Sequence, residues 1–326
     1  MSTTSEVLIN KFLQDVEEKG TFSWQRPYEV MMPFNWLTMK PYRGFNRILL
    51  PMGEYLTKNQ INQINKDNGW DYRFQKGIKW WSISFFKKDK RLVKEDEILE
   101  KFGEVPASSG PQIVPMFIGR DMPWTYFRGT DGNFYKQRNI LQYYDVCDIK
   151  YLRNSKGEPF PSRIASGEIE MILREPREVF DSYINREGIM LDDTHNGVPC
   201  YIPKLDVIQL NPRMVSESEY WSTAFHECGH STGAENRLNR EGVAGKIVKG
   251  SEEYAVEECI AEICAGLCCA ECGVYTFETS EHKAYENNLA YVQAYKKRIK
   301  EWGSKFIYVA SQAEDAFNYI MGYDED

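Results

Sequence analysis

The sequence has no apolar run long enough to cross a membrane. Its most apolar stretch, residues 264–272, is bounded by Glu262 and contains Glu271, whereas a transmembrane helix needs about 20 consecutive apolar residues. The first residues also show no basic segment followed by an apolar one, the pattern of a secretory signal. We therefore expect a cytoplasmic protein with no membrane partner.

Two nucleotide-binding signatures and a disulfide framework are missing as well. Neither GxxxxGK[ST] nor GxGxxG occurs, which argues against phosphate-binding loops of these two kinds. Eight cysteines in 326 residues do not make the framework of a short secreted chain, and six of them lie between Cys228 and Cys272. Histidine is scarce, with four in the chain, so a histidine pair at a metal-binding spacing is unlikely to arise by chance.

The two halves of the chain differ in charge. Residues 1–150 hold 22 Lys or Arg and 18 Asp or Glu, whereas residues 151–326 hold 18 and 30. The basic excess lies in residues 40–94, with 13 basic against 4 acidic side chains. Six of the eight tryptophans also precede residue 150. The halves therefore differ in kind, which indicates two domains.

Turn signals place the boundary between these domains. The segment 153–163 contains a glycine and two prolines, which disfavour regular structure. We predict an N-terminal domain of residues 1–152, a linker of residues 153–163 and a C-terminal domain of residues 164–326.

Hydrophobic periodicity predicts the α+β class. The first half should contain helices at 5–19 and 57–67, a strand at 79–87 and a hairpin of 124–127 with 133–135. The second half should contain a largely helical run at 164–187, short strands at 200–202 and 207–210, and helices at 216–232, 251–272, 282–301 and 304–321. We thus expect an α+β N-terminal domain and a mainly helical second domain with a small sheet.

The strongest chemical signal is His226-Glu-Cys-Gly-His230 on a predicted helix. Residues four apart share a helix face, so both imidazoles can bind one metal ion, with Glu227 beside the open coordination position. Two imidazoles and a carboxylate suit Zn²⁺, and other divalent ions would fit. The predicted reaction is metal-assisted hydrolysis of a peptide bond, in which Glu227 is the general base. Strand 200–202 or strand 207–210 could supply the edge that holds an extended peptide.

A third ligand is expected on the following helix. The stretch from Tyr254 to Glu262 resembles the downstream ExxxE/D element of the gluzincins, in which the first acid binds the metal. The resemblance assigns Glu258 as the third ligand, and places Glu262 one turn later to accept a hydrogen bond from a ligand histidine. Glu257 points about 100° away and is the less favoured ligand. A solvated acidic helix face is the alternative interpretation.

Motifs in both halves resemble the ArdC-like antirestriction proteins. They are Asn35-Trp-Leu-Thr-Met-Lys-Pro-Tyr42-Arg43-Gly-Phe-Asn46, Lys76-Gly-Ile-Lys79, Tyr201-Ile-Pro-Lys-Leu-Asp206, the HExxH with Arg237-Leu-Asn-Arg240, and Ala290-Tyr-Val. The resemblance implies an N-terminal domain that binds single-stranded DNA and a C-terminal zincin-like metallopeptidase domain. The chain departs from the family at Cys228 and Ser231, where larger side chains are usual, which affects the shape of the cleft and not the ligands.

The first half has the residue types that single-stranded DNA requires, namely cations for phosphates and aromatic faces for bases. We expect DNA contacts from Trp36, Tyr42, Arg43, Asn46, Arg47, Lys76, Lys79, Trp80 and Trp81. Tyr42, Arg43 and Asn46 rank highest because they lie in the ArdC-like motif. The alternatives are core packing for the aromatics and a solvated face for the lysines.

Three functions follow from these observations. The leading hypothesis is an antirestriction protein of a mobile element that binds incoming single-stranded DNA and uses a zinc metallopeptidase domain on DNA-bound proteins. The second is a non-catalytic DNA-binding protein with a structural zinc. The third is an inhibitor of restriction enzymes whose acidic second half mimics DNA.

Overall fold

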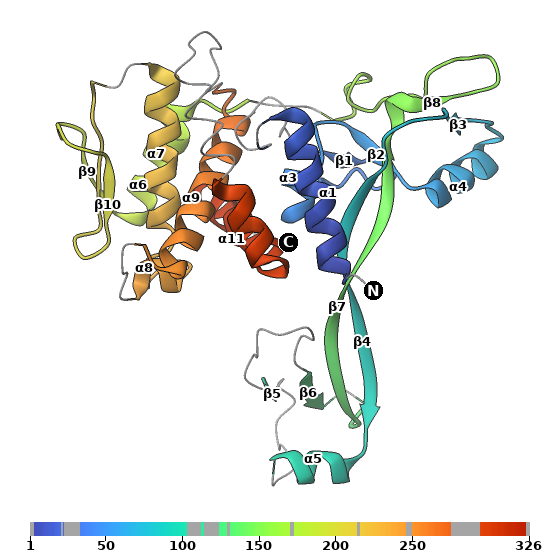
Figure 1. Cartoon of the computed structure of the whole chain (residues 1–326), viewed down its shortest axis with the longest axis horizontal. Helices are drawn as coiled ribbons and strands as arrows, with labels where there is room; N and C mark the ends of the chain where they lie inside the picture. Colours follow the sequence, from blue (N-terminus) through green and yellow to red (C-terminus); the bar gives the residue numbers. More distant parts are fainter. Residues whose placement is uncertain are drawn as a thin grey trace. The chain divides into compact units, whose positions relative to one another are not determined.

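The computed structural model describes residues 3–20, 22, 33–102, 112–113, 124–128, 131–169, 173–213, 216–245, 250–274 and 294–323. The chain forms two compact units, one from Met1–Ile83 with Asp145–Asp326 and one from Ser84–Tyr144. We call them unit 1 and unit 2 (Figure 1). Helices and strands occur in both, which confirms the α+β class.

Unit 1 contains most of the secondary structure. Its elements are α1 (Thr4–Lys19), β1 (Phe34–Asn35), α3 (Phe45–Leu49), β2 (Glu54–Leu56), α4 (Lys58–Asn68), β3 (Arg73–Phe74), the 3₁₀ turn η2 (Ile149–Tyr151), β8 (Leu152–Arg153), α6 (Pro176–Glu187), β9 (Met190–Asp192), β10 (Cys200–Ile202), β11 (Val207–Gln209), α7 (Glu217–Ser231), α8 (Glu241–Ala244), α9 (Glu252–Glu271) and α11 (Ser304–Met321). Residues 294–302 are also helical. Helix α11 packs against α9, α3 and α1.

Unit 2 is built on two long strands that begin or end in unit 1, β4 (Trp81–Val93) and β7 (Phe134–Asp148). It also contains α5 (Glu95–Phe102), β5 (Gln112–Ile113) and β6 (Thr125–Arg128). Strands β6 and β7 form the predicted hairpin, in which Thr125 pairs with Gln137 and Arg128 with Phe134.

Capping explains where several predicted helices begin and end. The Thr57 side chain accepts a hydrogen bond from the backbone N–H of Gln60 at 3.1 Å, and the Gln60 side chain accepts one from the Thr57 N–H at 2.9 Å. Gly69 ends the same helix in the left-handed conformation, φ 66°. The predicted helix at 57–67 is confirmed, with bounds Lys58–Asn68.

One predicted helical run is partly wrong, and another predicted helix lies partly outside the described residues. The helical run expected from residue 164 is wrong over its first part, because helix α6 begins only at Pro176 and residues 163–167 form turns. Proline fits the first turn of a helix but lacks the N–H that a helix interior requires, so Pro176 marks a start and not a continuation. Of the helix expected at 282–301, only the part from residue 294 lies within the described residues.

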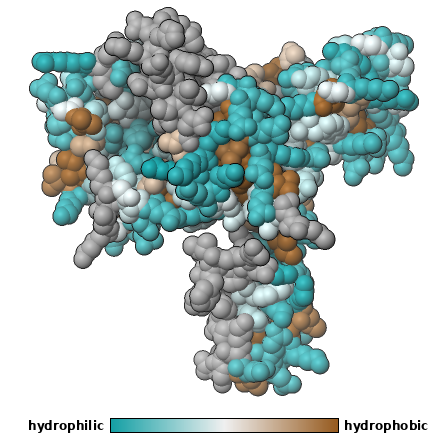
Figure 2. All heavy atoms as spheres, viewed as in Figure 1, coloured by the Kyte–Doolittle hydropathy of each residue, from teal (hydrophilic) through white to brown (hydrophobic). Residues whose placement is uncertain are grey.

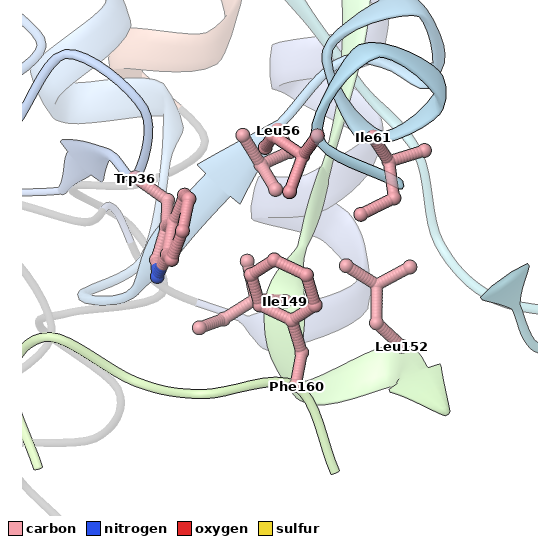
Figure 3. Packing of buried hydrophobic residues seen from close by; sticks show 7 residues of the cluster. Trp36, Leu56, Ile61, Ile149, Leu152 and Phe160 are labelled. Carbon is pink, nitrogen blue, oxygen red and sulfur yellow. The ribbon is translucent and has the colours of Figure 1, made fainter. Parts of the chain in front are cut away.

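A hydrophobic cluster organises the N-terminal part of unit 1. Figure 3 shows its side chains packed together, namely Trp36, Leu56, Ile61, Ile149, Leu152 and Phe160. The Trp36 and Phe160 rings meet edge to face with centroids 4.8 Å apart, and the indole N–H of Trp36 donates to the carbonyl of Pro161 at 2.8 Å. Part of the segment 153–163 is therefore fixed to this cluster, and its role as a linker stays a prediction.

A separate small sheet has the order β10-β11-β9. Strand β11 is antiparallel to β10 and parallel to β9, and β10 packs against helix α7. The predicted strands at 200–202 and 207–210 are confirmed. Within the described part of the chain β10 lies at an edge of this sheet and β11 at its centre, so only β10 can offer a free edge near α7. No helix that the structure describes is long and apolar enough to span a membrane.

Candidate metal centre

The HExxH motif lies on helix α7, which is packed closely against α9. Ser216 caps the start of this helix, because its hydroxyl accepts a hydrogen bond from the backbone N–H of Glu219 at 3.2 Å. A Cβ at Gly229 would lie 3.1 Å from the Cα of Ala261. A larger residue would force the two helices apart by a few tenths of an ångström, so glycine favours this close approach, which brings the motif face to face with the acidic residues of α9.

Three side chains converge between the two helices. The Nε2 atoms of His226 and His230 are 3.1 Å apart. The carboxylate of Glu258 faces both, with one oxygen 3.6 Å from His226 Nε2 and the other 3.8 Å from His230 Nε2. One potential ligand atom from each of the three lies within 4.8 Å of the others. Two imidazoles and one carboxylate are a donor set of catalytic metal sites with an open position, and the residues fit a divalent cation.

The other ring nitrogens face two further glutamates. His226 Nδ1 is 3.4 Å from Glu262 Oε2, and His230 Nδ1 is 3.3 Å from Glu257 Oε1. A carboxylate at Nδ1 keeps the proton on that nitrogen and leaves Nε2 free to bind a metal. Glu262 thus lies beside a candidate ligand histidine, and the hydrogen-bonding role that the resemblance implies for it stays a prediction. Glu257, which the sequence analysis treated as the less favoured ligand, makes the equivalent contact with the second histidine.

Glu257 is itself held by a buried arginine. Its side chain and that of Arg240 form a bidentate pair, with Nε to Oε2 at 2.9 Å and Nη2 to Oε1 at 2.6 Å. Residues 257 and 240 are only 3% and 5% exposed. Arg240 also donates to the carbonyl of Gly229 and to the hydroxyl of Thr232, both at 2.7 Å. The arginine therefore connects the end of the motif helix to the carboxylate that faces His230.

The electrostatic potential of this cluster favours a cation. Burial alone would lower the pKa of His226, but hydrogen bonds with Glu258 and Glu262 outweigh it and raise the pKa to about 10. Burial would raise the pKa of Glu258, yet its hydrogen bonds with His226 and Tyr254 hold it at about 2. Burial also opposes ionisation of Glu257, and Arg240 with His230 keeps the pKa of that carboxyl below its ordinary value.

The glutamate of the motif, Glu227 on α7, interacts electrostatically with residues of α9 and of strand β10. Glu227 is 6% exposed. Burial raises the pKa of Cys200 on β10, and the charge of Glu227 raises it further. The hydrogen bond with Glu258 raises the pKa of Tyr254 to about 12, with a smaller contribution from Glu227. The charge of the Glu227 carboxylate therefore acts on Tyr254 of α9 and on Cys200 of β10.

A second buried arginine fixes the β10–β11 turn to the end of α7. Arg237 is fully buried and donates to the two carboxylate oxygens of Asp206 at 2.9 and 2.7 Å. It also donates to the carbonyl of Ser231 at 3.0 Å, and its Nε lies 3.2 Å from Glu187. The hydroxyl of Tyr201 donates to Asp206 at 2.8 Å. Strand β10 is therefore held in place relative to the HExxH helix.

The residues predicted to bind DNA divide by exposure. Trp36, Tyr42, Arg47 and Trp81 are buried, Asn46 is half-buried, and Arg43, Lys76, Lys79 and Trp80 are exposed. Arg47 lies between Glu271 at 3.6 Å and Glu314 at 3.9 Å, above the ring of Phe317. Its guanidinium connects the ArdC-like motif to helices α9 and α11.

Two of the exposed residues also have partners within unit 1. The ammonium of Lys79 lies 2.6 Å from Asp15 and 4.3 Å from the centroid of the Trp81 ring. The Trp80 ring packs against Phe74 with centroids 4.7 Å apart. These contacts do not test DNA binding, so the roles of Lys79 and Trp80 in it stay predictions.

Comparisons with known proteins connect these features. Residues 178–305 match the family model of a zincin-like metallopeptidase. Two DNA primases TraC of Escherichia coli are each 24% identical, over 98% and 94% of this chain but 20% and 26% of their own lengths. An uncharacterized protein of Sinorhizobium fredii, y4eC, is 32% identical over 29% of this chain and 31% of its own. The chain thus spans a fifth to a third of these relatives.

Solved structures match the whole chain. The metal-free crystal structure of the antirestriction protein ArdC from plasmid R388 has a TM-score of 0.64 and 19% identity, and covers 99% of this chain and 98% of its own. The Mn(II)-bound structure of the same protein has a TM-score of 0.62 with 18% identity, over the same shares of the two chains. The chain therefore has the ArdC fold over nearly its whole length, with a region that matches a zincin-like metallopeptidase family model, so the resemblance to the ArdC-like proteins is confirmed at the level of the fold.

Proposed function

We propose that this protein is a metal-dependent peptidase that also binds single-stranded DNA and protects incoming DNA from restriction. The observation that carries the enzymatic part is the convergence of His226, His230 and Glu258 beside the buried Glu227. The similar ArdC protein of plasmid R388 has an Mn(II)-bound crystal structure, which supports a divalent metal for this chain. We propose Zn²⁺ as the resident ion because imidazole and carboxylate ligands suit it.

The residues around the proposed metal have distinct tasks. A metal held by the three ligands would supply Lewis acidity toward a scissile carbonyl and make a bound water more acidic. Glu227 accepts the proton of the attacking water and returns it to the leaving amine. Glu262 and Glu257 keep the Nδ1 protons of the two histidines in place. The phenol of Tyr254, which interacts with Glu258, stays protonated and can donate a hydrogen bond at the site.

The substrate we propose is an extended peptide segment. Among the described residues strand β10 is one of the two edge strands of its sheet, and it packs against α7 and is fixed by the Tyr201–Asp206–Arg237 contacts. An edge strand can bind an extended chain through backbone hydrogen bonds. A peptide along β10 would run beside the helix that carries Glu227. In keeping with the DNA-binding proposal, we infer that proteins bound to DNA, including restriction enzymes, are the substrates.

Metal binding can be measured without knowing the substrate. We expect the purified chain to bind one Mn²⁺ per molecule. Electron paramagnetic resonance can measure this binding, and we expect Zn²⁺ to displace the Mn²⁺. Glu258→Gln should weaken Mn²⁺ binding at least tenfold, since it replaces an anionic ligand by a neutral amide of the same shape. Glu253→Gln, an exposed position earlier on the same helix, is the matched control. Equal affinity in Glu258→Gln would contradict the ligand assignment.

The DNA-binding part is supported by charge and by the relatives. Residues 40–94 carry 13 Lys or Arg against 4 Asp or Glu, and the similar proteins include DNA primases and an antirestriction protein. In unit 1 the exposed candidates are Arg43, Lys76, Lys79 and Trp80. A single strand binds such cations through its phosphates and aromatic rings through its bases.

Fluorescence anisotropy of a labelled oligonucleotide tests this proposal. We expect the full chain to prefer single-stranded over duplex DNA. Its affinity should fall as the salt concentration rises, and the slope of log affinity against log salt should be about 0.7 per phosphate contact. Arg43→Gln with Lys76→Gln should lower that slope by about 1.4 if both cations bind phosphates. Lys156→Gln with Lys204→Gln, exposed lysines outside the basic segment, is the control pair. Absence of DNA binding by the full chain would refute this part of the function.

A further inference from the structure

Unit 2 presents a long ribbon, which consists of residues 84–93 of β4 and residues 134–144 of β7, where β4 pairs with β7 and β6 pairs with β7 only at residues 134–137. Figure 1 shows the two strands running side by side. Side chains alternate between the two faces of a strand, and yet residues 85–88 and 90–92 are all exposed. Both faces of β4 in this stretch are therefore open to solvent, which is unusual for a strand that follows the buried residues 81–83.

Aromatic side chains are exposed on this ribbon. Phe85, Phe86, Tyr143 and Tyr144 are between 36% and 48% exposed. The rings of Phe85 and Tyr144 lie across the strand pair with centroids 5.2 Å apart. The hydrophobic cluster of unit 2 is made by other residues, namely Val93, Ile98, Tyr126 and Phe134. The four exposed rings are thus not needed for that cluster, although leaving them in water is costly.

The ribbon is also strongly basic. Its two segments contain six Lys or Arg and one acid, Asp89. Asp89 is paired with Arg91 at 2.9 Å and with Arg138 at 3.3 Å. Lys87 and Lys88 follow the two phenylalanines directly and are exposed. Figure 2 shows hydrophobic and hydrophilic residues interspersed over the visible face of this unit.

We infer that this ribbon is a binding site for single-stranded DNA, separate from the exposed residues of unit 1. The inference rests on the proposed DNA binding and adds a site that includes Phe86, Lys87 and Lys88. Bases stack on the exposed rings, and the adjacent ammonium groups bind the phosphates. In a duplex the faces of the bases are already stacked on one another, so rings of this kind favour a single strand.

The positive charge of the ribbon favours DNA over a protein partner. A protein surface would have to bury the ribbon's cations against carboxylates, at a desolvation cost that cancels much of the attraction. A single-stranded nucleic acid releases its condensed counterions when it binds the same cations, and its bases can stack on the aromatic rings in the same complex. Exposed aromatic rings next to lysines therefore fit a single-stranded nucleic acid better than an apolar protein surface.

The aromatic part is tested at Phe86. Phe86→Leu keeps an apolar side chain but removes the aromatic face, and should weaken binding of a labelled single-stranded oligonucleotide about 5- to 100-fold. Phe86→Tyr keeps the ring and should bind like the unchanged chain. Both variants leave the Phe85–Tyr144 contact in place, and circular dichroism checks that they fold. Equal binding by Phe86→Leu would overturn stacking at this site.

The cationic part is tested by salt dependence. Lys87→Gln with Lys88→Gln should lower the slope of log affinity against log salt by about 1.4, the loss of two phosphate contacts on a single strand. Lys297→Gln with Lys300→Gln, two exposed lysines in a helix of unit 1, should leave the slope unchanged. An unchanged slope in the ribbon variant overturns the site.

The same series distinguishes this inference from the proposed function. If the unchanged chain binds single-stranded DNA and every ribbon variant binds equally well, the ribbon is not the site and DNA binding by unit 1 stands. If the unchanged chain binds no DNA, the proposed function itself fails. Equal affinity for duplex and single strand would overturn base stacking on the ribbon.

Discussion

Replacing Glu227 by glutamine is expected to abolish peptide cleavage while leaving the fold and the metal site intact. Glutamine has the shape of glutamate but cannot take a proton from water, and general acid–base catalysis contributes about 10²- to 10⁴-fold to a rate. The ligands His226, His230 and Glu258 are unchanged in this variant. We expect kcat to fall by about that factor, with Mn²⁺ affinity changed by less than the tenfold expected for loss of a ligand.

The measurement uses a denatured protein such as casein as a general substrate, with the metal-loaded chain. Glu217→Gln, on the first turn of the same helix and exposed to solvent, controls for the loss of a carboxylate from α7. It should cleave like the unchanged chain. If Glu227→Gln cleaves at the normal rate, Glu227 is not the base and the assigned mechanism is wrong.

The same variant separates the enzymatic proposal from a purely DNA-binding one. A protein that protects DNA only by covering it should protect equally well with glutamine at residue 227. A protein that protects DNA by hydrolysing bound proteins should lose protection together with cleavage. Challenging coated single-stranded DNA with a nuclease, and transferring a plasmid into a restricting host, measure the two modes of protection separately.

The sequence could bring the candidate metal-binding residues together because the geometry of the motif is local. His226 and His230 are one helical turn apart, so their shared face follows from the helix alone. Glu258 and Glu262 repeat the same spacing on α9, and the structure places both near the histidines. What the motif could not supply was the contact between α7 and α9, which depends on the close approach at Gly229.

The sequence failed where a side chain's partner is distant along the chain. Glu257 looked misplaced because it points away from Glu258 on an ideal helix, and the structure shows that this direction leads to His230 and Arg240. Trp36 and Arg47 looked like DNA contacts because their residue types suit DNA. Their burial depends on packing with Phe160, more than 100 residues away, and on the glutamates of α9 and α11, which composition does not reveal.

Replacing Arg240 by methionine should be among the most destabilising single changes in the chain. It removes one partner of a buried ion pair and leaves the Glu257 carboxylate, 3% exposed, with no arginine. Breaking such a pair costs about 3–5 kcal/mol. The free energy of unfolding in urea measures the loss. Arg177→Met breaks the ion pair of Arg177 with Asp181, both exposed, and should cost no more than about 1 kcal/mol.

A second substitution separates stability from metal binding. Adding Glu257→Gln to Arg240→Met removes the buried charge, so the double variant should regain part of the lost stability. It should not regain metal affinity, because a neutral amide is a weaker acceptor for the Nδ1 proton of His230, and loss of such a partner typically weakens metal binding 10- to 100-fold. If the double variant binds Mn²⁺ like the unchanged chain, Glu257 and Arg240 serve the fold alone. If stability recovers and affinity does not, the buried pair orients His230, and a residue that the motif left without a role belongs to the metal centre.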